Sequence, residues 1–509
     1  MSRIVLATIN SRYHHASLGL RCIMANLGPL ADEASLHEFI LTQRPVDIVE
    51  QILLEKPAVV GLGVYIWNAR PSLDLVVLLK RLRPEIVVVV GGPEVSHGQE
   101  QQTICSLADY VVAGEGELGF RGLCEDLLAG RTVQQKIVEG EVPDLKRLAF
   151  PYDLYDEEDI RNRVVYVESS RGCPYGCEFC LSALDRRVRN FPRAAFLHEL
   201  EGLLKRGVKR FKFVDRSINV DPQAVCEILR FFLPWREAGL FLHFEMVPHI
   251  LPAPLCEMLE LFPTGSIQIE VGVQTLNEEV ALRIGRRHDP AALKTMLPLL
   301  REHTGVHIHT DLIVGLPGES LESFAGGFDH LLSLAPQEIQ VGVLKWLRGA
   351  PIDRQTATWR MEYDPEAPYE LLQNSTIDFA TMQRLKRFSR YWDLVANSGN
   401  FRECLSLLLT KRSAFFSFLT FSDWLFAQCG RTSHISLDNL AHWIFDYLIE
   451  NERVLPDRAG AAIAADYTST PRRPPPWLKP FVDESTAVVA TSQTLPNRQA
   501  RHAATTRRE

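Results

Sequence analysis

Three cysteines between residues 171 and 180 have the type and spacing needed to hold a metal cluster. The segment reads Arg-Gly-Cys-Pro-Tyr-Gly-Cys-Glu-Phe-Cys and places Cys173, Cys177 and Cys180 at C-x3-C-x2-C spacing. Three thiolates on one tight loop can bind three irons of a cuboidal iron–sulfur cluster and leave the fourth iron open to a small molecule. The alternatives are three buried thiols or a structural zinc site, which requires four ligands. Because the next candidate ligand, His198, lies in a helical pattern, the sequence favours the cluster.

Phe179, directly before the third cysteine, completes a motif that resembles the signature of the radical S-adenosylmethionine (SAM) enzymes. The resemblance implies a [4Fe–4S] cluster on the three cysteines, with SAM bound at the open iron through its amino and carboxylate groups. It also implies that an electron from the cluster cleaves SAM and that the resulting 5′-deoxyadenosyl radical abstracts hydrogen from a substrate. That electron is expected from an external flavodoxin-like or ferredoxin-like donor.

Strand and helix patterns alternate on either side of this loop, from residue 163 to residue 345. Strands are expected at 163–170, 210–215, 241–246, 266–273, 307–314 and 338–344, with helices at 191–205, 222–233, 253–261, 290–303 and 321–334. Six β/α steps predict a partial (β/α)6 TIM barrel. Its active site should lie at the C-terminal ends of the strands.

Four polar residues near these strand ends are candidates for SAM contacts. Two ribose hydroxyls suit carboxylate or amide acceptors, and a carboxylate suits arginine. Their order resembles the oxygen-independent coproporphyrinogen dehydrogenase and its relatives. The resemblance implies that Glu245 meets the SAM amino group, Gln274 and Asp311 contact the ribose, and Arg286 binds the carboxylate. Taken singly, an Asp or Gln at a strand end is more often a cap or turn residue.

Other polar residues of this region have less specific interpretations. His243, His307 and His309 alternate along strands, so hydrogen bonding in the barrel interior is expected rather than metal binding. Asp215 and Asn219 follow the second strand and either point toward SAM or substrate or form a turn. The sequence assigns no catalytic residue.

The first 140 residues predict a doubly wound parallel sheet. Short apolar runs alternate with helical patterns, as in α/β folds. Ligands of such sheets bind at the carboxyl ends of strands. Glycines fall at these ends and would let a large planar ligand approach the backbone, although tight turns without a ligand are the alternative. The glycines are Gly61, Gly63, Gly91, Gly92, Gly114 and Gly116.

The order and spacing of this region resemble the cobalamin (vitamin B12) binding domain that precedes many radical SAM domains. The resemblance implies a B12-binding-like Rossmann domain with cobalamin contacts at Gly91, Gly92, Gly114 and Gly116. The D-x-H-x-x-G motif, whose histidine is the lower cobalt ligand, is absent. The corresponding loop, residues 10–19, contains His14 and His15 without the preceding Asp. A domain retained only for structure is therefore the alternative.

The remaining segments complete the expected α/β architecture. Residues 1–140 form the cobalamin-type domain, 141–162 a solvated linker and 163–345 the partial barrel. Residues 346–455 predict a helical C-terminal domain, with helices at 369–397, 401–429 and 437–448. That domain resembles the extra domain of an uncharacterised branch of cobalamin-type radical SAM proteins. Residues 456–509 are rich in Ala, Thr, Ser, Pro and Arg and predict a disordered tail.

Composition limits the class of protein. The chain has 509 residues and a net charge of −8, which gives no general electrostatic attraction to nucleic acid. Its ten cysteines form no disulfide framework. Neither a signal peptide nor an apolar run of membrane-spanning length is present, so a cytoplasmic protein without a membrane partner is expected.

The two resemblances together imply a radical SAM enzyme that carries out cobalamin-dependent methyl transfer to carbon. One alternative is a radical SAM rearrangement or oxidation without methyl transfer. Another is a relative that modifies tRNA, which the acidic balance of the chain disfavours. The substrate, a small molecule or a peptide, is not identified by the sequence.

Overall fold

The computed structural model of the chain describes residues 3–287, 289–410, 412–469, 472–482 and 497–506. The chain forms two compact units. Unit 1 comprises residues 1–216, 345–353 and 364–370, and unit 2 comprises residues 217–344, 354–363 and 371–509. None of the described helices combines the length and apolar character required to span a membrane.

Unit 1 contains the predicted doubly wound sheet. Its six parallel strands have the order β2-β1-β3-β4-β5-β6. The chain passes from β1 to β2 on one side and then crosses to β3 on the other side of β1, which creates a topological switch point between β1 and β3, where such sheets bind ligands. The strands are β1 (Ile4–Asn10), β2 (Ala34–Ile40), β3 (Val59–Gly63), β4 (Val87–Gly91), β5 (Tyr110–Ala113) and β6 (Ile137–Glu139). Only β6 lacks a counterpart among the predicted strands.

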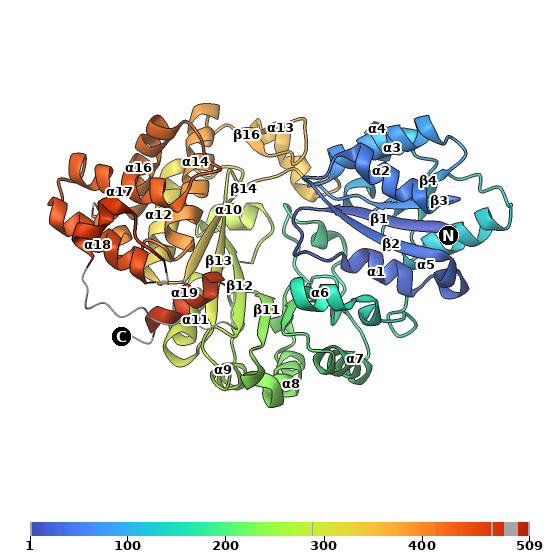
Figure 1. Cartoon of the computed structure of the whole chain (residues 1–509), viewed down its shortest axis with the longest axis horizontal. Coiled ribbons are helices and arrows are strands. Elements are labelled where there is room, and N and C mark those ends of the chain that lie inside the picture. Colours follow the sequence, from blue (N-terminus) through green and yellow to red (C-terminus); the bar gives the residue numbers. More distant parts are fainter. Residues whose placement is uncertain (1–2, 288, 411, 470–471, 483–496, 507–509) are drawn as a thin grey trace. The chain divides into compact units, whose positions relative to one another are not determined.

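Helices cover both faces of this sheet (Figure 1). Ile48 and Leu75 pack with one face of the strands, whereas Leu20 and Phe120 pack with the other. Burial on both faces explains why the strands are continuous apolar runs rather than alternating ones. The helices are α1 (Leu18–Ala25), α2 (Pro45–Leu54), α3 (Ala69–Leu82), α4 (Thr103–Leu107) and α5 (Gly116–Leu128).

The predicted linker is packed rather than solvated. Tyr155 is fully buried, and its hydroxyl donates to the backbone oxygen of Tyr166 at 2.8 Å. Helix α6 (Glu157–Asn162) begins with a capping box at Asp156. Within α6, Asp159 pairs with the buried Arg21 at 2.6 Å. Aromatic burial and this ion pair fasten the segment to α1, contacts that its Pro-rich and acidic composition does not reveal.

The predicted barrel is confirmed as a second six-stranded sheet with the order β14-β13-β12-β11-β10-β7. Unit 1 holds β7 (Val165–Val167), α7 (Arg193–Lys205) and β10 (Arg210–Phe213). In unit 2, β11 (Phe241–Met246), β12 (Ile267–Gln274), β13 (His307–Val314) and β14 (Glu338–Val343) are parallel neighbours. The helices between them are α8 (Pro222–Phe232), α9 (Ala253–Glu260), α10 (Glu278–Arg283), α11 (Pro290–His303) and α12 (Leu321–Ser333).

Helices of the C-terminal region pack around an aromatic core in unit 2. Phe388 and Trp392 of α14 contact the ring of Phe418 in α16 at centroid distances of 5.3 and 4.9 Å. The predicted helix at residues 369–397 is wrong at its start, because residues 371–373 form a strand and Asp378 caps the helix. The elements are β15 (Glu362–Tyr363), β16 (Leu371–Gln373), α14 (Phe379–Trp392), α15 (Arg402–Leu408), α16 (Ala414–Cys429) and α17 (Leu437–Glu450).

The predicted disordered tail contains three helices among its described residues: α18 (Pro456–Thr468), the 3-10 helix Pro476–Phe481 and α19 (Asn497–Thr506). In α18, Ile463 is fully buried, and the Asp466 carboxylate accepts from the backbone nitrogens of Glu403 and Cys404 at 3.0 Å. The tail prediction was therefore wrong at these residues. Alanine-rich composition looks simple in sequence but forms helix readily when a small apolar face is buried. Residues 470–471, 483–496 and 507–509 of the predicted tail lie outside the described residues.

Candidate functional site

The cysteine loop of unit 1 is closed at its base by a short antiparallel pair. Strands β8 (Ser170–Arg171) and β9 (Arg189–Asn190) pair Ser170 with Asn190 and Arg171 with Arg189. Within the loop, Cys173 N donates to Asp185 O and Cys180 N donates to Cys177 O, each at 3.0 Å. The loop thus connects two paired strands and is ordered by its own backbone hydrogen bonds.

The donor chemistry of this loop suits an iron–sulfur cluster. Cys177 is buried, and Cys173 and Cys180 are half-buried, so three thiol groups lie on one loop of limited solvent exposure. Gly172 has a φ of +89°, and a Cβ there would lie 2.2 Å from Arg187 O, so only glycine fits this turn. The described residues gather no three His, Cys, Asp or Glu side chains as a formed metal centre would. The assignment of the cysteines as ligands stays a prediction.

A carboxylate of the first domain joins the two sides of the loop base. Glu115 accepts from Arg171 at 2.6 Å and also pairs with Arg189. Arg171 further donates to Glu117 at 2.6 Å and to Glu168 at 3.1 Å. Sequence reasoning singled out the glycines of the Gly-Glu-Gly-Glu turn and missed its two acidic residues. Their alternation with glycine was the available signal.

Burial dominates the electrostatics of Glu168. It raises the pKa of this carboxyl to about 7, although the Arg171 charge opposes the shift. A group that titrates near neutrality therefore lies in the wall of the neighbouring cavity.

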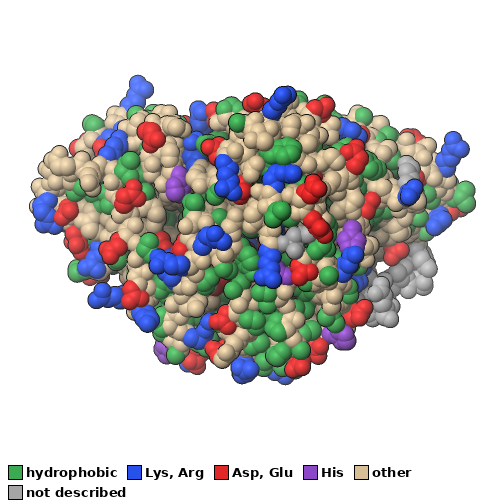
Figure 2. All heavy atoms as spheres, turned by 180° about the vertical axis from the view of Figure 1, so that it is seen from behind, with side chains coloured by type: hydrophobic (Ala, Val, Ile, Leu, Met, Phe, Trp, Pro, Cys, Tyr) green, Lys and Arg blue, Asp and Glu red, His purple; other side chains and the backbone are tan. Residues whose placement is uncertain are grey.

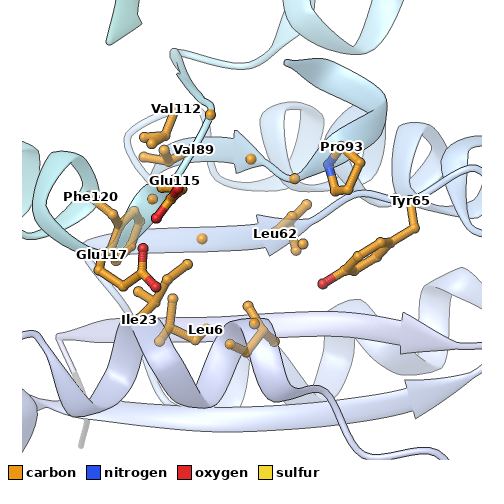
Figure 3. A pocket seen from close by; sticks show the side chains of 18 of the residues that line it. Leu6, Ile23, Leu62, Tyr65, Val89, Pro93, Val112, Glu115, Glu117 and Phe120 are labelled. Atoms are coloured by element: carbon orange, nitrogen blue, oxygen red, sulfur yellow. The ribbon is translucent and has the colours of Figure 1, made fainter. Parts of the chain in front are cut away.

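That cavity occupies the carboxyl ends of the strands in unit 1 and measures about 460 Å³. Such a volume lies in the range of small-molecule and cofactor sites. Figure 3 shows Tyr65 and Pro93 at one end of the cavity and Glu115, Glu117 and Phe120 at the other. All four glycines predicted to contact cobalamin line it: Gly91, Gly92, Gly114 and Gly116.

Missing side chains create much of this space. Gly92 has a φ of +109°, and a Cβ there would lie 2.5 Å from Val64 O. A Cβ at Gly61 would lie 2.8 Å from the Phe120 ring, whereas one at Gly116 would make ordinary contacts with Ile23 at 3.5 Å and Val112 at 3.7 Å. A cradle of glycines with apolar walls fits a large flat ligand such as cobalamin.

Neither histidine of the loop at residues 10–19 lines this cavity. His15 Nδ1 instead lies 2.5 Å from the Tyr166 hydroxyl, and burial lowers the pKa of His15 to about 4. The structure places no cobalt ligand from His14 or His15 in the cavity wall, because the loop packs against Tyr166 and Val164.

Three of the predicted SAM contacts meet around Gly272 in unit 2. Arg286 donates to the backbone oxygen of Gly272. Asp311 on β13 is the residue opposite Gly272 in the strand register. Gln274 has a φ of +71° beside an irregularity in the strand, and a Cβ at Gly272 would lie 2.7 Å from its Nε2 atom. Glu245 lies one strand further, in register with Glu270.

Two buried oxygens in this group make no hydrogen bond among the described residues, namely Gln274 Oε1 and Asp311 Oδ1, although Asp311 Oδ1 lies at ion-pair distance from His309 Nε2. Unsatisfied buried acceptors are costly in a folded protein and usually mark a ligand or water position. Two acceptors on neighbouring strand ends match the two hydroxyls of a ribose, so the residues present fit SAM.

A buried charged row supports Asp311. Its Oδ1 atom lies 3.2 Å from His309 Nε2, and His309 Nδ1 lies 3.5 Å from Glu338. Burial alone would lower the pKa of His309, but Asp311 and Glu338 outweigh it and raise that pKa to about 10. His307 Nε2 donates to the same Glu338 at 2.8 Å, and His243 Nε2 contacts Glu270 at 2.9 Å. The expected interior hydrogen bonding is confirmed for His243 and His307, whereas His309 contacts its neighbours as an ion pair.

Asp215 and Asn219 form turns, which is one of the two roles that the sequence predicts for them. In unit 1, the buried Asp215 accepts from Ser169 N at 3.0 Å and from the Ser170 hydroxyl at 2.5 Å. In unit 2, Asn219 bonds to both the nitrogen and the oxygen of Val247 at 2.9 Å. Both side chains use their polar atoms to position backbone.

Comparisons with known proteins agree with this architecture. Residues 3–124 match the B12 binding domain, residues 167–330 match the radical SAM superfamily, and residues 357–501 match a protein family of unknown function, DUF4080. The third match extends beyond residue 455 into α18 and α19, which agrees with the helices found there.

Several sequence relatives are named methyltransferases, and others are named tRNA-2-methylthio-N(6)-dimethylallyladenosine synthase, such as that of Shewanella baltica, which is 23% identical over 50% of this chain and 56% of its own. The 2-(S-pantetheinyl)-carbapenam-3-carboxylate methyltransferase of Streptantibioticus cattleyicolor is 26% identical over 61% of this chain and 51% of its own. The cobalamin-dependent radical SAM methyltransferase TokK of Streptomyces tokunonensis is 25% identical over 63% of this chain and 52% of its own. The chain spans between about half and two thirds of the length of the curated relatives it matches.

Among solved structures, the radical SAM methyltransferase TsrM of Kitasatospora setae, with tryptophan and a SAM analogue bound, has a TM-score of 0.56. It is 19% identical and covers 70% of this chain and 76% of its own. A second TsrM structure, with cobalamin and a [4Fe–4S] cluster bound, has a TM-score of 0.55. This likeness shows a shared fold.

A glycine-lined Rossmann domain followed by a partial barrel with a three-cysteine loop defines a protein built to hold two large cofactors. The chain contains a B12 binding domain at residues 3–124, a radical SAM domain at residues 167–330 and a DUF4080 region at residues 357–501. The cofactors of this class are a [4Fe–4S] cluster, SAM and cobalamin.

Proposed function

We propose that the protein is a cobalamin-dependent radical SAM methyltransferase that methylates a carbon atom of an organic substrate. The observation that carries the proposal is the joining of the glycine cradle to the cysteine loop within unit 1. Arg171 immediately precedes the loop and binds Glu115 and Glu117 of the cavity wall. One structural unit thus presents a cofactor cavity and a metal-ligand loop tied by the same carboxylates.

The cysteines Cys173, Cys177 and Cys180 would hold the cluster, whose chemistry when bound is the reductive cleavage of SAM. Arg286 would bind the SAM carboxylate, Glu245 its amino group, and Gln274 and Asp311 its ribose hydroxyls. Gln274 Oε1, which is buried without a hydrogen bond among the described residues, and Asp311, which His309 holds at the neighbouring strand end, support this assignment. The protein residues bind and orient the cofactors and exclude water, since the cofactors themselves carry the hard chemistry.

Cobalamin would lie in the glycine cradle and supply the methyl group. Because the cavity wall contains neither His14 nor His15, we propose that it binds without a histidine from the loop at residues 10–19. The relatives of this chain that are named methyltransferases support methyl transfer over a rearrangement or oxidation. An external one-electron donor and a small-molecule or peptide substrate complete the proposed reaction.

The cluster is tested by single Cys173→Ala, Cys177→Ala and Cys180→Ala variants reconstituted anaerobically with iron and sulfide. Each should lose the visible absorbance of the cluster and the formation of 5′-deoxyadenosine from SAM. Cys226→Ala, which removes a buried thiol from α8, should keep both. Retention of the absorbance and of SAM cleavage after a loop substitution would refute the assignment.

Cobalamin binding is tested by two matched leucine substitutions in α5. Gly116→Leu projects a side chain into the cavity wall, whereas a Cβ at Gly122 meets no atom within 4 Å. The protein and the Gly122→Leu variant should retain hydroxocobalamin through desalting, and Gly116→Leu should lose it. Equal retention by both variants would place cobalamin elsewhere, and no retention by the unmodified protein would indicate a domain kept for structure.

A further inference from the structure

The segment that follows the cysteine loop presents exposed cations beside exposed aliphatic side chains. Arg186 and Arg187 are exposed, and neither makes an ion pair within the described parts of the chain. Leu184 and Val188 on either side of them are 49% and 41% exposed. The one acidic residue here, Asp185, already accepts from Arg189 at 3.1 Å.

This segment lies directly against the cysteine loop. Cys173 N donates to Asp185 O at 3.0 Å, and a Cβ at Gly172 would lie 2.2 Å from Arg187 O. A Cβ at Gly176, between the first two cysteines, would lie 3.5 Å from the Arg186 guanidinium carbon. The exposed segment and the predicted cluster ligands are therefore linked by one backbone hydrogen bond and by direct packing.

We propose that the segment Leu184–Val188 is the docking surface for an acidic one-electron-transfer protein that reduces the cluster. The inference rests on the proposed function, because a radical SAM cluster needs an electron from outside the chain. In the docked complex the donor is oxidised by one electron and the cluster is reduced by one electron, with no bond or proton exchanged. Two cations with two aliphatic neighbours suit a small, transient interface with complementary charge.

Charge complementarity argues for this occupant. The chain carries a net charge of −8, which repels an acidic partner except where cations gather. Figure 2 shows basic and acidic side chains interspersed over one face of the molecule. Nucleic acid binding is less favoured here, because strong phosphate binding requires many cationic contacts. This segment offers only two arginines that make no ion pair among the described residues.

The test measures electron transfer with a reduced plant-type ferredoxin, an acidic [2Fe–2S] protein, as the probe. The variant is Arg186→Glu/Arg187→Glu, and the matched control is Arg81→Glu/Arg83→Glu. The control also places two exposed arginines beside an exposed leucine, Leu82, which is 54% exposed. Cluster reduction is followed anaerobically by stopped-flow absorbance, and the dissociation constant of ferredoxin from the reconstituted protein is measured by calorimetry.

At low ionic strength, ferredoxin should reduce the cluster of the Arg186→Glu/Arg187→Glu variant at least about tenfold more slowly than that of the unmodified protein. The physical reason is that complementary charge raises the association rate about 10–10³-fold. Its reduction by dithionite should be unchanged, and the Arg81→Glu/Arg83→Glu control should match the unmodified protein with both reductants. An unchanged ferredoxin rate in the variant, or an equal loss in the control, would overturn the inference. Loss of tRNA binding with an unchanged ferredoxin rate would identify a nucleic-acid surface instead and would also overturn it.

The salt dependence of cluster reduction in the unmodified protein is a second measurement. It tests the docking surface even where the variant fails to load its cluster. Its ferredoxin rate should fall with added salt, while its dithionite rate should not follow the same trend. A ferredoxin rate that is insensitive to salt would overturn the docking surface. A protein that loads no cluster would instead refute the proposed function, so the two failures are distinguishable.

Discussion

Single residues in the interior of unit 2 form a row of alternating charge that leads to a predicted SAM contact. Arg498 of α19 pairs with Glu338 at 2.8 Å, Glu338 lies near His309, and His309 lies 3.2 Å from Asp311. Such a row is stable because each buried charge faces an opposite one, while an unpaired charge would be expensive. His309 therefore holds Asp311 in place rather than touching substrate.

Replacing His309 should weaken SAM binding through Asp311. A buried contact with a charged partner, such as the ion pair between His309 and Asp311, contributes about 1.5–3 kcal/mol, so His309→Gln should raise the SAM dissociation constant roughly 10–100-fold. Equilibrium dialysis under anaerobic conditions measures this constant. His307→Gln is the matched control, because His307 contacts Glu338 but lies four residues from Asp311 on the same strand. Equal weakening in both variants would show that the effect is general destabilisation.

The same residue predicts a pH dependence of stability. The pKa of His309 is raised to about 10 in the folded protein, so its ion pairs stabilise the fold below the ordinary histidine pKa. That contribution shrinks as the pH rises from there and is lost as it passes through about 10. Urea unfolding between pH 7 and pH 10.5 should show a decline that is smaller in His309→Gln. An identical decline in the variant would assign the effect to other groups.

At the scale of elements, α19 closes the interior of the barrel strands in unit 2 from the amino ends. Arg498 bridges Glu338 of β14 and Asp393, and Gln499 contacts Gln268 of β12 at 2.5 Å. His502 lies against His307, with ring centroids 5.1 Å apart. Polar side chains of the helix satisfy polar side chains of the strands, which explains a barrel interior that is not purely apolar.

Removing Arg498 should loosen this helix. Arg498→Ala deletes two ion pairs, and the backbone amides of α19 should exchange hydrogen at least about tenfold faster, since local opening follows the loss of local contacts. Hydrogen exchange followed by mass spectrometry of peptides covering 497–506 gives the rate. Arg458→Ala, an exposed site on α18, should leave the rate unchanged. Unaltered exchange in Arg498→Ala would show that the ion pairs do not hold the helix.

At the scale of the whole molecule, the two units divide the chemistry. Unit 1 contains the glycine cradle and the three cysteines, and unit 2 contains the four residues predicted to contact SAM. Unit 1 also includes residues 345–353 and 364–370, whose Arg348 and Tyr369 contact the buried Glu94 at 2.9 and 2.7 Å. A chain segment distant in sequence thus supports the turn that carries Gly92 and Pro93.

Cobalamin should stabilise the protein mainly through unit 1. At a ligand concentration 100 times the dissociation constant, binding adds about 2.7 kcal/mol to the free energy of unfolding. Addition of hydroxocobalamin should therefore raise the unfolding temperature and slow hydrogen exchange most in peptides containing Gly63, Gly92 and Gly116. The Gly116→Leu variant should show neither effect. Strong stabilisation without protection of these peptides would point to a different binding place.

Local and periodic features of this protein are determined by the sequence alone. The cysteine spacing, the alternation of strands with helices and the glycines at strand ends can be recognised because each depends on neighbours within a few residues. For that reason the predicted sheets agree with the structure closely, as does the presence of Gly91, Gly92, Gly114 and Gly116 around one cavity.

Only the tertiary structure decided which distant side chains meet. It turned His15 toward Tyr166 and away from the cavity, and it set Glu115 between the two arginines at the base of the cysteine loop. It also folded part of the apparently disordered tail into α18 and α19. Such contacts depend on strand register, packing and burial summed over the chain, which no local pattern of residues encodes.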